Sequence, residues 1–146
     1  MLNQQERSRT WLQELKHNGY RLTSPRKAVV EVMANSDTVL SPAEVYDIGR
    51  GRYAKLGLVT VYRTLEKLEA MGLVQRVHRP DGCEAFIAGV EGHQHLLICE
   101  NCGRVEYFGG DKLDGLIDKV QGDSGYEIRD HWLQFFGLCR ACQRNN

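Results

Sequence analysis

Apolar residues recur at helical spacing in four segments of the front half of the chain. Asn18-Gly19 ends the first segment, and a serine N-cap followed by proline begins the second, at Ser24, and the third, at Ser41. The fourth runs from about Val59 to Met71. The inward residues of the four segments are Trp11, Leu12, Leu15, Ala28, Val29, Val32, Met33, Val45, Ile48, Val61, Leu65, Leu68 and Met71. This pattern predicts four consecutive helices.

A strand pattern follows the fourth helix. Two short runs, Leu73–His78 and Cys83–Ala88, flank the turn formers Arg79-Pro80-Asp81-Gly82, which is typical of a hairpin. Helices followed by a small hairpin have the order of a winged helix-turn-helix.

The rear of the chain combines further strands with one helix. We expect strands at His93–Cys99, Gly103–Phe108 and about Tyr126–Phe136, and a helix at about Lys112–Gln121. The inner face of that helix is predicted to be Leu113, Leu116, Ile117 and Val120.

Charge separates the same two parts. The 146 residues have a net charge of zero, but 13 basic and 9 acidic side chains precede Cys83, whereas 6 basic and 10 acidic ones follow from there. A cationic front and an anionic back indicate two modules with different partners. We therefore predict an α+β protein with an N-terminal winged helix-turn-helix DNA-binding domain over residues 1–88, a hinge over 89–92 and a small α/β metal-binding domain over 93–146.

Composition adds an expected location. The longest apolar run falls far short of the ~20 residues that cross a bilayer. The amino terminus lacks the apolar segment of a secretory signal. Five cysteines, four of them in CxxC pairs, fit a cytoplasmic metal site better than a secreted disulfide framework. We expect a cytoplasmic protein with no membrane partner.

The strongest chemical signal is the pair of CxxC motifs. Cys99 and Cys102 form the first, and Cys139 and Cys142 form the second. Two such pairs place four thiolates around a tetrahedral Zn²⁺, a closed coordination sphere whose role is structural. Ordinary buried cysteines and an iron centre of the rubredoxin type remain the alternatives.

Histidines suggest a second metal site in the rear domain. His93 and His95 lie two apart on a predicted strand, so their side chains share a face. His131 on the last strand and Asp114 on the intervening helix would complete a zinc- or iron-type site if these elements converge.

A third cluster flanks the predicted hairpin turn. His78 and Cys83 would face each other across its first rung, next to the hinge, where they can ligate a metal or be an idle surface histidine and an inert cysteine. Glu84, Glu106 or the His93/His95 pair would supply a further ligand.

The fourth helix carries residues suited to reading DNA. Thr60, Tyr62 and Arg63 face outward near its start, where arginine can bond a guanine edge and tyrosine can reach phosphates or thymine methyls. A solvated face would also be polar. Phosphate contacts would come from Arg21, Arg26, Lys27, Arg50, Arg52 and Lys55.

Taken together, these motifs resemble the ferric uptake regulator family of metal-responsive repressors. The resemblance rests on Arg21–Arg26, Ser41–Tyr46 and Gly57–Leu65, with His93-Gln94-His95 ahead of the cysteine pairs. It implies a DNA-binding winged helix, a homodimer formed through the rear domain, palindromic double-stranded promoter DNA as partner, and metal as corepressor. It implies neither an enzyme nor a small-molecule substrate.

Departures from the family pattern bear on the metal. The positions of the usual sensing ligands hold Val39, Ile87, Gln94 and Leu96, and Tyr107 stands where an acid is expected. The positions of His93, His95, Asp114 and His131 match a second metal site of the family. We interpret His78 and Cys83 as a relocated sensor, and a thiolate ligand favours Zn²⁺ over Fe²⁺. This predicts a zinc uptake regulator, with Fe²⁺ or Mn²⁺ as alternative regulatory ions.

We expect zinc bound at the hinge to close the dimer onto DNA. Within the family, an iron- or peroxide-responsive member remains an alternative. Outside it, the alternatives are a CxxC redox or electron-transfer protein and a zinc-ribbon interaction module.

Overall fold

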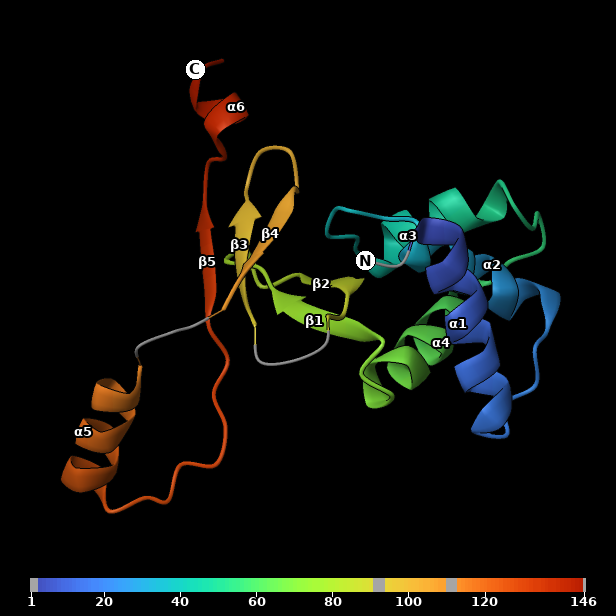
Figure 1. Cartoon of the computed structure of the whole chain (residues 1–146). Helices are drawn as coiled ribbons and strands as arrows, with labels where there is room; N and C mark the ends of the chain where they lie inside the picture. The colour runs from blue at the N-terminus through green and yellow to red at the C-terminus, as the bar shows by residue number, and fades with distance from the viewer. Residues whose placement is uncertain (1–2, 91–93, 110–112, 146) are drawn as a thin grey trace. The chain divides into compact units, whose positions relative to one another are not determined.

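The computed structural model describes residues 3–90, 94–109 and 113–145. Contacts within the chain divide it into two compact units, residues 1–90 (unit 1) and 91–146 (unit 2). Helices dominate unit 1 and a small sheet dominates unit 2 (Figure 1). The predicted hinge over 89–92 spans this boundary, and its residues 91 and 92 lie outside the described parts of the chain.

Four helices with clear termination signals build the front of unit 1. They are α1 (Gln4–His17), α2 (Ser24–Ala34), α3 (Pro42–Arg50) and α4 (Leu58–Ala70). The third begins as predicted, because Ser41 and Glu44 form a reciprocal capping box. The second begins one residue earlier than predicted: Thr23 is its N-cap and accepts from the backbone N–H of Arg26, so Ser24 is already helical.

One apolar core joins these helices. Its buried members include Trp11 and Leu15 from α1, and buried residues of α2 and α4 pack with them. The prediction for Ile48 on α3 is wrong, because this residue is 49% exposed instead of pointing inward. Gly49 is buried in α3, and a Cβ at this position would lie 2.5 Å from the Leu56 side chain. The close approach explains a glycine inside a helix, where it otherwise lowers stability.

A two-stranded hairpin, which we call the wing, follows α4. Strand β1 (Val74–His78) pairs antiparallel with β2 (Glu84–Ala88), and the register places His78 opposite Glu84. The backbone N–H of Arg79 donates to the Cys83 carbonyl, and Gly82 takes a positive φ of 83° in the turn.

This register corrects the expectation that His78 and Cys83 face each other. Asp81 accepts a hydrogen bond from the Cys83 N–H at 2.8 Å, so the turn closes on Arg79 and Cys83 instead. His78 is consequently paired one position further along β2 than the sequence suggested.

Unit 2 contains a three-stranded sheet in the order β4-β3-β5 (Figure 1). Its elements are β3 (His95–Cys99), β4 (Val105–Phe108), α5 (Asp114–Ser124), β5 (Gln134–Gly137) and α6 (Arg140–Gln143). Strand β3 pairs antiparallel with β4 and parallel with β5.

Two expectations for unit 2 are wrong in extent. The last strand covers only Gln134–Gly137, because β3 offers pairing partners over Leu96–Cys99 alone. The helix runs from Asp114 to Ser124, and the predicted residue 112 lies outside the described chain.

The predicted inner face of α5 is only partly covered. Within the described chain no residue of this helix is fully buried: Leu113 and Ile117 are half-buried, and Leu116 remains 57% exposed. None of the described helices has the length and apolar character needed to span a membrane.

An arginine ties the wing to α4. Arg76 on β1 makes a two-pronged contact with Glu69 on α4, through Nη2 to Oε2 at 2.7 Å and Nε to Oε1 at 2.9 Å. The same guanidinium pairs with Glu84 on β2 and lies over the Phe86 ring, 5.1 Å from its centroid. The hydrogen bond from Arg76 lowers the pKa of Glu69, against an opposing effect of burial.

We predict that Glu69→Gln lowers the free energy of unfolding by about 0.5–1 kcal/mol at neutral pH, since the pair is partly solvent-screened. The folded-state pKa of Glu69 lies below its unfolded value. The contribution is therefore complete above the unfolded carboxyl pKa of about 4.3 and is lost as pH falls through the folded pKa. Urea unfolding of wild type and Glu69→Gln across pH 3–7 measures this contribution to the free energy of unfolding.

The matched control is Glu66→Gln, an exposed acid one turn earlier on the same helix. A stability difference between wild type and Glu69→Gln that stays constant down to pH 3 would contradict the assignment.

Candidate metal centre and nucleic-acid interface

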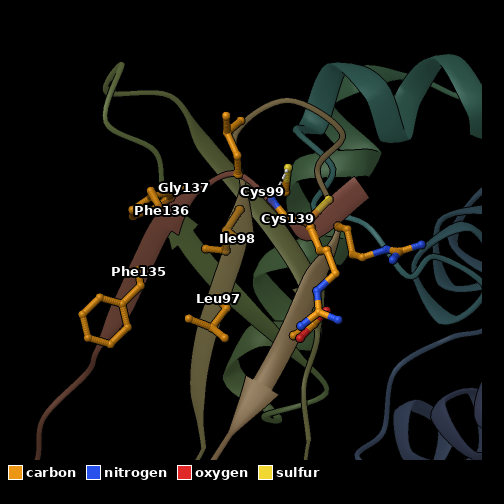
Figure 2. Close-up of a pocket in the computed structure, with 11 residues that line it drawn as sticks. Leu97, Ile98, Cys99, Phe135, Phe136, Gly137 and Cys139 are labelled. Atoms are coloured by element: carbon orange, nitrogen blue, oxygen red, sulfur yellow. Dashed lines mark hydrogen bonds between the residues drawn. The ribbon is translucent and has the colours of Figure 1, made fainter. Parts of the chain in front are cut away.

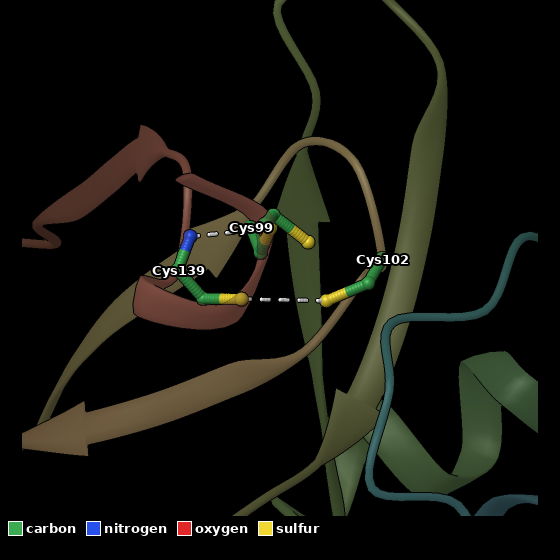
Figure 3. A group of neighbouring side chains, drawn as sticks. Cys99, Cys102 and Cys139 are labelled. Atoms are coloured by element: carbon green, nitrogen blue, oxygen red, sulfur yellow. Dashed lines mark hydrogen bonds between the residues drawn. The ribbon is translucent and has the colours of Figure 1, made fainter. Parts of the chain in front are cut away.

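The four cysteines of the CxxC pairs converge in unit 2. Cys99 ends β3, Cys102 follows in the adjoining turn, and Cys139 and Cys142 come from the start and body of α6. Their sulfur atoms all lie within 4.8 Å of one another. Cys102 Sγ and Cys139 Sγ are 3.8 Å apart (Figure 3). Gly103, with a positive φ of 72°, reverses the chain directly after the first pair.

The sulfur arrangement fits a tetrahedral zinc ion. Zn–S bonds of about 2.3 Å place neighbouring sulfurs of a tetrahedron about 3.8 Å apart. A disulfide instead needs about 2.05 Å, and the structure, which describes all five cysteines, has each of them free. The donor set is soft, fourfold and without an open position, as in structural zinc sites.

Hydrogen bonds within the cluster polarise its thiols. Backbone N–H groups of Cys102 and Cys139 lower the pKa of the Cys99 thiol to about 6. At Cys142, the Asn101 side-chain amide lowers the pKa of the thiol, but the neighbouring sulfurs and burial outweigh it and raise this pKa to about 11. The cluster thus favours the thiolate of Cys99 but disfavours a second thiolate at Cys142. A bound dication would offset the repulsion between the two negative charges.

Two of the predicted histidine-site residues also meet. The rings of His95 and His131 lie 5.3 Å apart between centroids, and His95 is buried beside Phe108 at 5.2 Å. Asp114 is exposed at the start of α5 and does not join them, and His93 lies outside the described residues. Among the residues that the structure describes, only the four cysteines form a group of three or more potential metal donors.

The remaining predicted ligands are scattered. His78, Cys83 and Glu84 are exposed on the wing, and Glu84 is engaged by Arg76. Glu106 on β4 lines a cavity of about 530 Å³ beside the cysteine cluster. Leu97 and Phe135, opposite each other on β3 and β5, line the same cavity (Figure 2).

Helix α4 presents a mixed outward face. Tyr62 and Arg63 are exposed as predicted, whereas Thr60 is half-buried. Val59, which was not among the predicted DNA-contacting residues, is 64% exposed and lies one turn before Tyr62. The i, i+3 spacing from Tyr62 was the available signal.

The basic residues predicted to contact phosphates differ in exposure and in their contacts with neighbouring residues. Arg21, Lys27 and Lys55 are exposed. Arg26 is held internally, since its guanidinium donates to the Arg21 carbonyl and lies over the Tyr20 ring. Two further basic residues are engaged with neighbours, Arg52 with Glu31 and Arg50 with the Tyr46 ring.

A helical unit with a wing and a separate unit with a four-cysteine cluster define an α+β DNA-binding regulator of the metal-responsive class. The ferric uptake regulator family model matches residues 17–136, and the chain belongs to this family. The family consists of transcription regulators, not enzymes.

The chain is similar to regulators named for iron uptake, for a peroxide operon and for zinc uptake. The ferric uptake regulation protein of Bacillus subtilis (strain 168) is 34% identical over 88% of this chain and 89% of that protein. The peroxide operon regulator of the same organism is 29% identical over 91% of both. A zinc uptake regulator solved with zinc and DNA has a TM-score of 0.77 at 22% identity, covering 99% of this chain and 98% of that one, and shares the fold.

We predict that Cys139→Ser removes about one zinc per chain that otherwise resists dialysis against a chelator, because a fourth thiolate is lost. Metal analysis after dialysis measures the loss, and thermal unfolding should show unit 2 destabilised.

Cys83→Ser is the matched control, since Cys83 is exposed on the wing and remote in sequence from the cluster. Equal chelator-resistant zinc in wild type and Cys139→Ser would rule out the four-sulfur site.

Proposed function

We propose that this protein is a zinc-responsive transcriptional repressor that binds palindromic promoter DNA as a homodimer in the cytoplasm. The observation that carries the proposal is the convergence of four thiols at tetrahedral zinc spacing, in a chain that also has an exposed recognition-type helix. Membership of the ferric uptake regulator family supports the metal-responsive part.

Zinc is the preferred structural ion because soft thiolates select it over harder divalent cations. Cys99, Cys102, Cys139 and Cys142 would hold it. The bound ion would supply the positive charge that lets four neighbouring thiolates coexist, and it would connect the end of β3 to α6.

A regulatory ion would be held by His95 and His131, with His93 as a further ligand. The proximity of the first two rings on separate segments supports this set. Imidazole donors suit zinc and also ferrous iron, so Fe²⁺ and Mn²⁺ are the alternative ions. The ion would raise the affinity for DNA only to the extent that DNA binds the metal-loaded form more tightly than the metal-free form.

Dimerisation is supported by apolar surface on unit 2. Leu97 and Phe135 are exposed neighbours on β3 and β5, and Leu116 and Val120 are exposed on α5. Surfaces of this kind mark contacts with another chain. A second copy would cover them and bring two α4 helices onto half-sites about 34–36 Å apart.

DNA binding is supported by α4 and its surroundings. Tyr62 and Arg63 are exposed on one face of the helix. The N-cap is Gly57, and in the described chain no side chain caps the backbone N–H groups of the first turn. Such groups suit a phosphate. Lys27 and Lys55 add exposed positive charge to unit 1.

Two other functions remain as alternatives. An iron- or peroxide-responsive regulator has support from relatives of both kinds at similar identity. A CxxC redox protein would use the four thiols for electron transfer, and thiols that stay reactive in the zinc-loaded protein would favour it.

The central test is His131→Ala. We expect the zinc concentration that induces DNA binding to rise at least about tenfold, because an imidazole ligand is removed. Fluorescence anisotropy with duplexes selected from a randomised pool, in buffered zinc, iron or manganese, measures the response. The control is His17→Ala, an exposed histidine in the last turn of α1.

Binding that no metal tightens in wild type would refute the repressor function. Tightening by iron alone would refute zinc as the corepressor.

A separate variant locates the sensor. If His78 and Cys83 form it, Cys83→Ser abolishes zinc-induced DNA binding while the four-sulfur zinc and the dimer persist, because only a wing ligand is lost. The same anisotropy titration, with metal analysis and gel filtration, decides this. Regulation that survives in Cys83→Ser but fails in His131→Ala would assign sensing to unit 2.

A further inference from the structure

The outward face of α4 begins with an apolar side chain that packs on little of the fold. Val59 is 64% exposed, more than any other large hydrophobic residue in the described part of unit 1. It lies in the first turn of the helix, after the N-cap Gly57. The inward residues Val61, Leu65 and Leu68 fill the core from the opposite face of the helix.

Helical spacing aligns Val59 with the residues already expected to read DNA. Val59, Tyr62, Arg63 and Glu66 occupy i, i+3, i+4 and i+7, and therefore one face. Val59 stands at the amino-terminal end of this face, and the amino-terminal residues of a recognition helix contact base edges.

We propose that Val59 is a specificity-determining residue that packs against the 5-methyl group of a thymine in the major groove. The inference rests on the proposed function, since it requires α4 to enter that groove. The thymine methyl is the apolar feature of the major-groove code. Valine is stiff at χ1 in a helix, so its two methyl groups meet the base with little loss of rotamer freedom.

The surroundings favour DNA over a protein partner. Along the same face Val59 is followed by Tyr62, the cation Arg63 and the acid Glu66, so the exposed apolar surface, which also includes Leu58 at 45%, is confined to the first turns of α4. A protein partner needs a broad apolar patch, whereas a single methyl group needs one apolar side chain. The excess of basic over acidic residues before Cys83 favours a polyanion.

The spacing along the helix also locates the base. Val59 and Tyr62 are three residues apart, which is about 4.5 Å along the axis. Successive bases on one strand are about 3.4 Å apart. With α4 lying along the groove, the thymine that Val59 contacts is therefore within one or two base steps of the base nearest Tyr62.

The test replaces single thymines by uracil, which removes only the methyl group. Full-length zinc-loaded protein selects duplexes from a randomised pool, and each thymine of a half-site is then changed to uracil in turn. In wild type, one such change per half-site should weaken binding about fourfold, the effect of one buried methyl group. In Val59→Ala, uracil at that position should not change the affinity for the duplex, whereas uracil at the other positions should weaken binding as it does in wild type.

Ile48→Ala is the matched control, because Ile48 is also an exposed aliphatic residue, at 49%, but lies on α3. It should retain the wild-type uracil pattern. Val59→Ala is expected to fold normally, since alanine favours the helix at an exposed site, and circular dichroism checks this.

An unchanged uracil pattern in Val59→Ala, with zinc-dependent binding intact, overturns the inference and leaves the proposed function standing. Wild-type protein that enriches no duplex with zinc or iron overturns the proposed function itself, and the inference with it.

Discussion

Unit 2 brings together four sulfur atoms from two segments far apart in its sequence. Its strands have four or five residues, α6 has four, and α5 buries none of its residues within the described chain. So small a core contributes little hydrophobic stabilisation, and domains of this kind rely on a metal or a partner. A zinc ion bound by the four cysteines would connect the end of β3 and its following turn to the segment after β5, and would thereby hold the parallel pair between them.

Unit 1 is stabilised by different physics. Buried side chains from all four helices and from the wing form one apolar cluster. Arg76 adds a polar connection from the wing to α4, between Glu69 and Glu84. Gly89 fits closely at the base of the wing, where a Cβ would lie 2.5 Å from the Gly72 carbonyl oxygen. Unit 1 therefore has the extended apolar core, whereas unit 2 has the cluster of potential zinc ligands.

This division suits a regulator whose proposed DNA-reading surface persists while its metal state varies. The exposed face of α4 is built on a packed core, so its side chains are positioned independently of the cysteine cluster. The four cysteines and the exposed apolar residues Leu97, Phe135 and Leu116 belong to unit 2. Metal binding and contact with another chain would therefore act on the same unit.

Local signals in the sequence were sufficient for the helices, the hairpin and the four-cysteine cluster, because helical period, capping residues and CxxC spacing act over a few residues. The pairing of His78 with Glu84, the proximity of His131 to His95 and the exposure of Leu116 on α5 were decided by the tertiary structure. These depend on how a turn closes and on which distant segments meet, and the chain's periodicity carries no information about either.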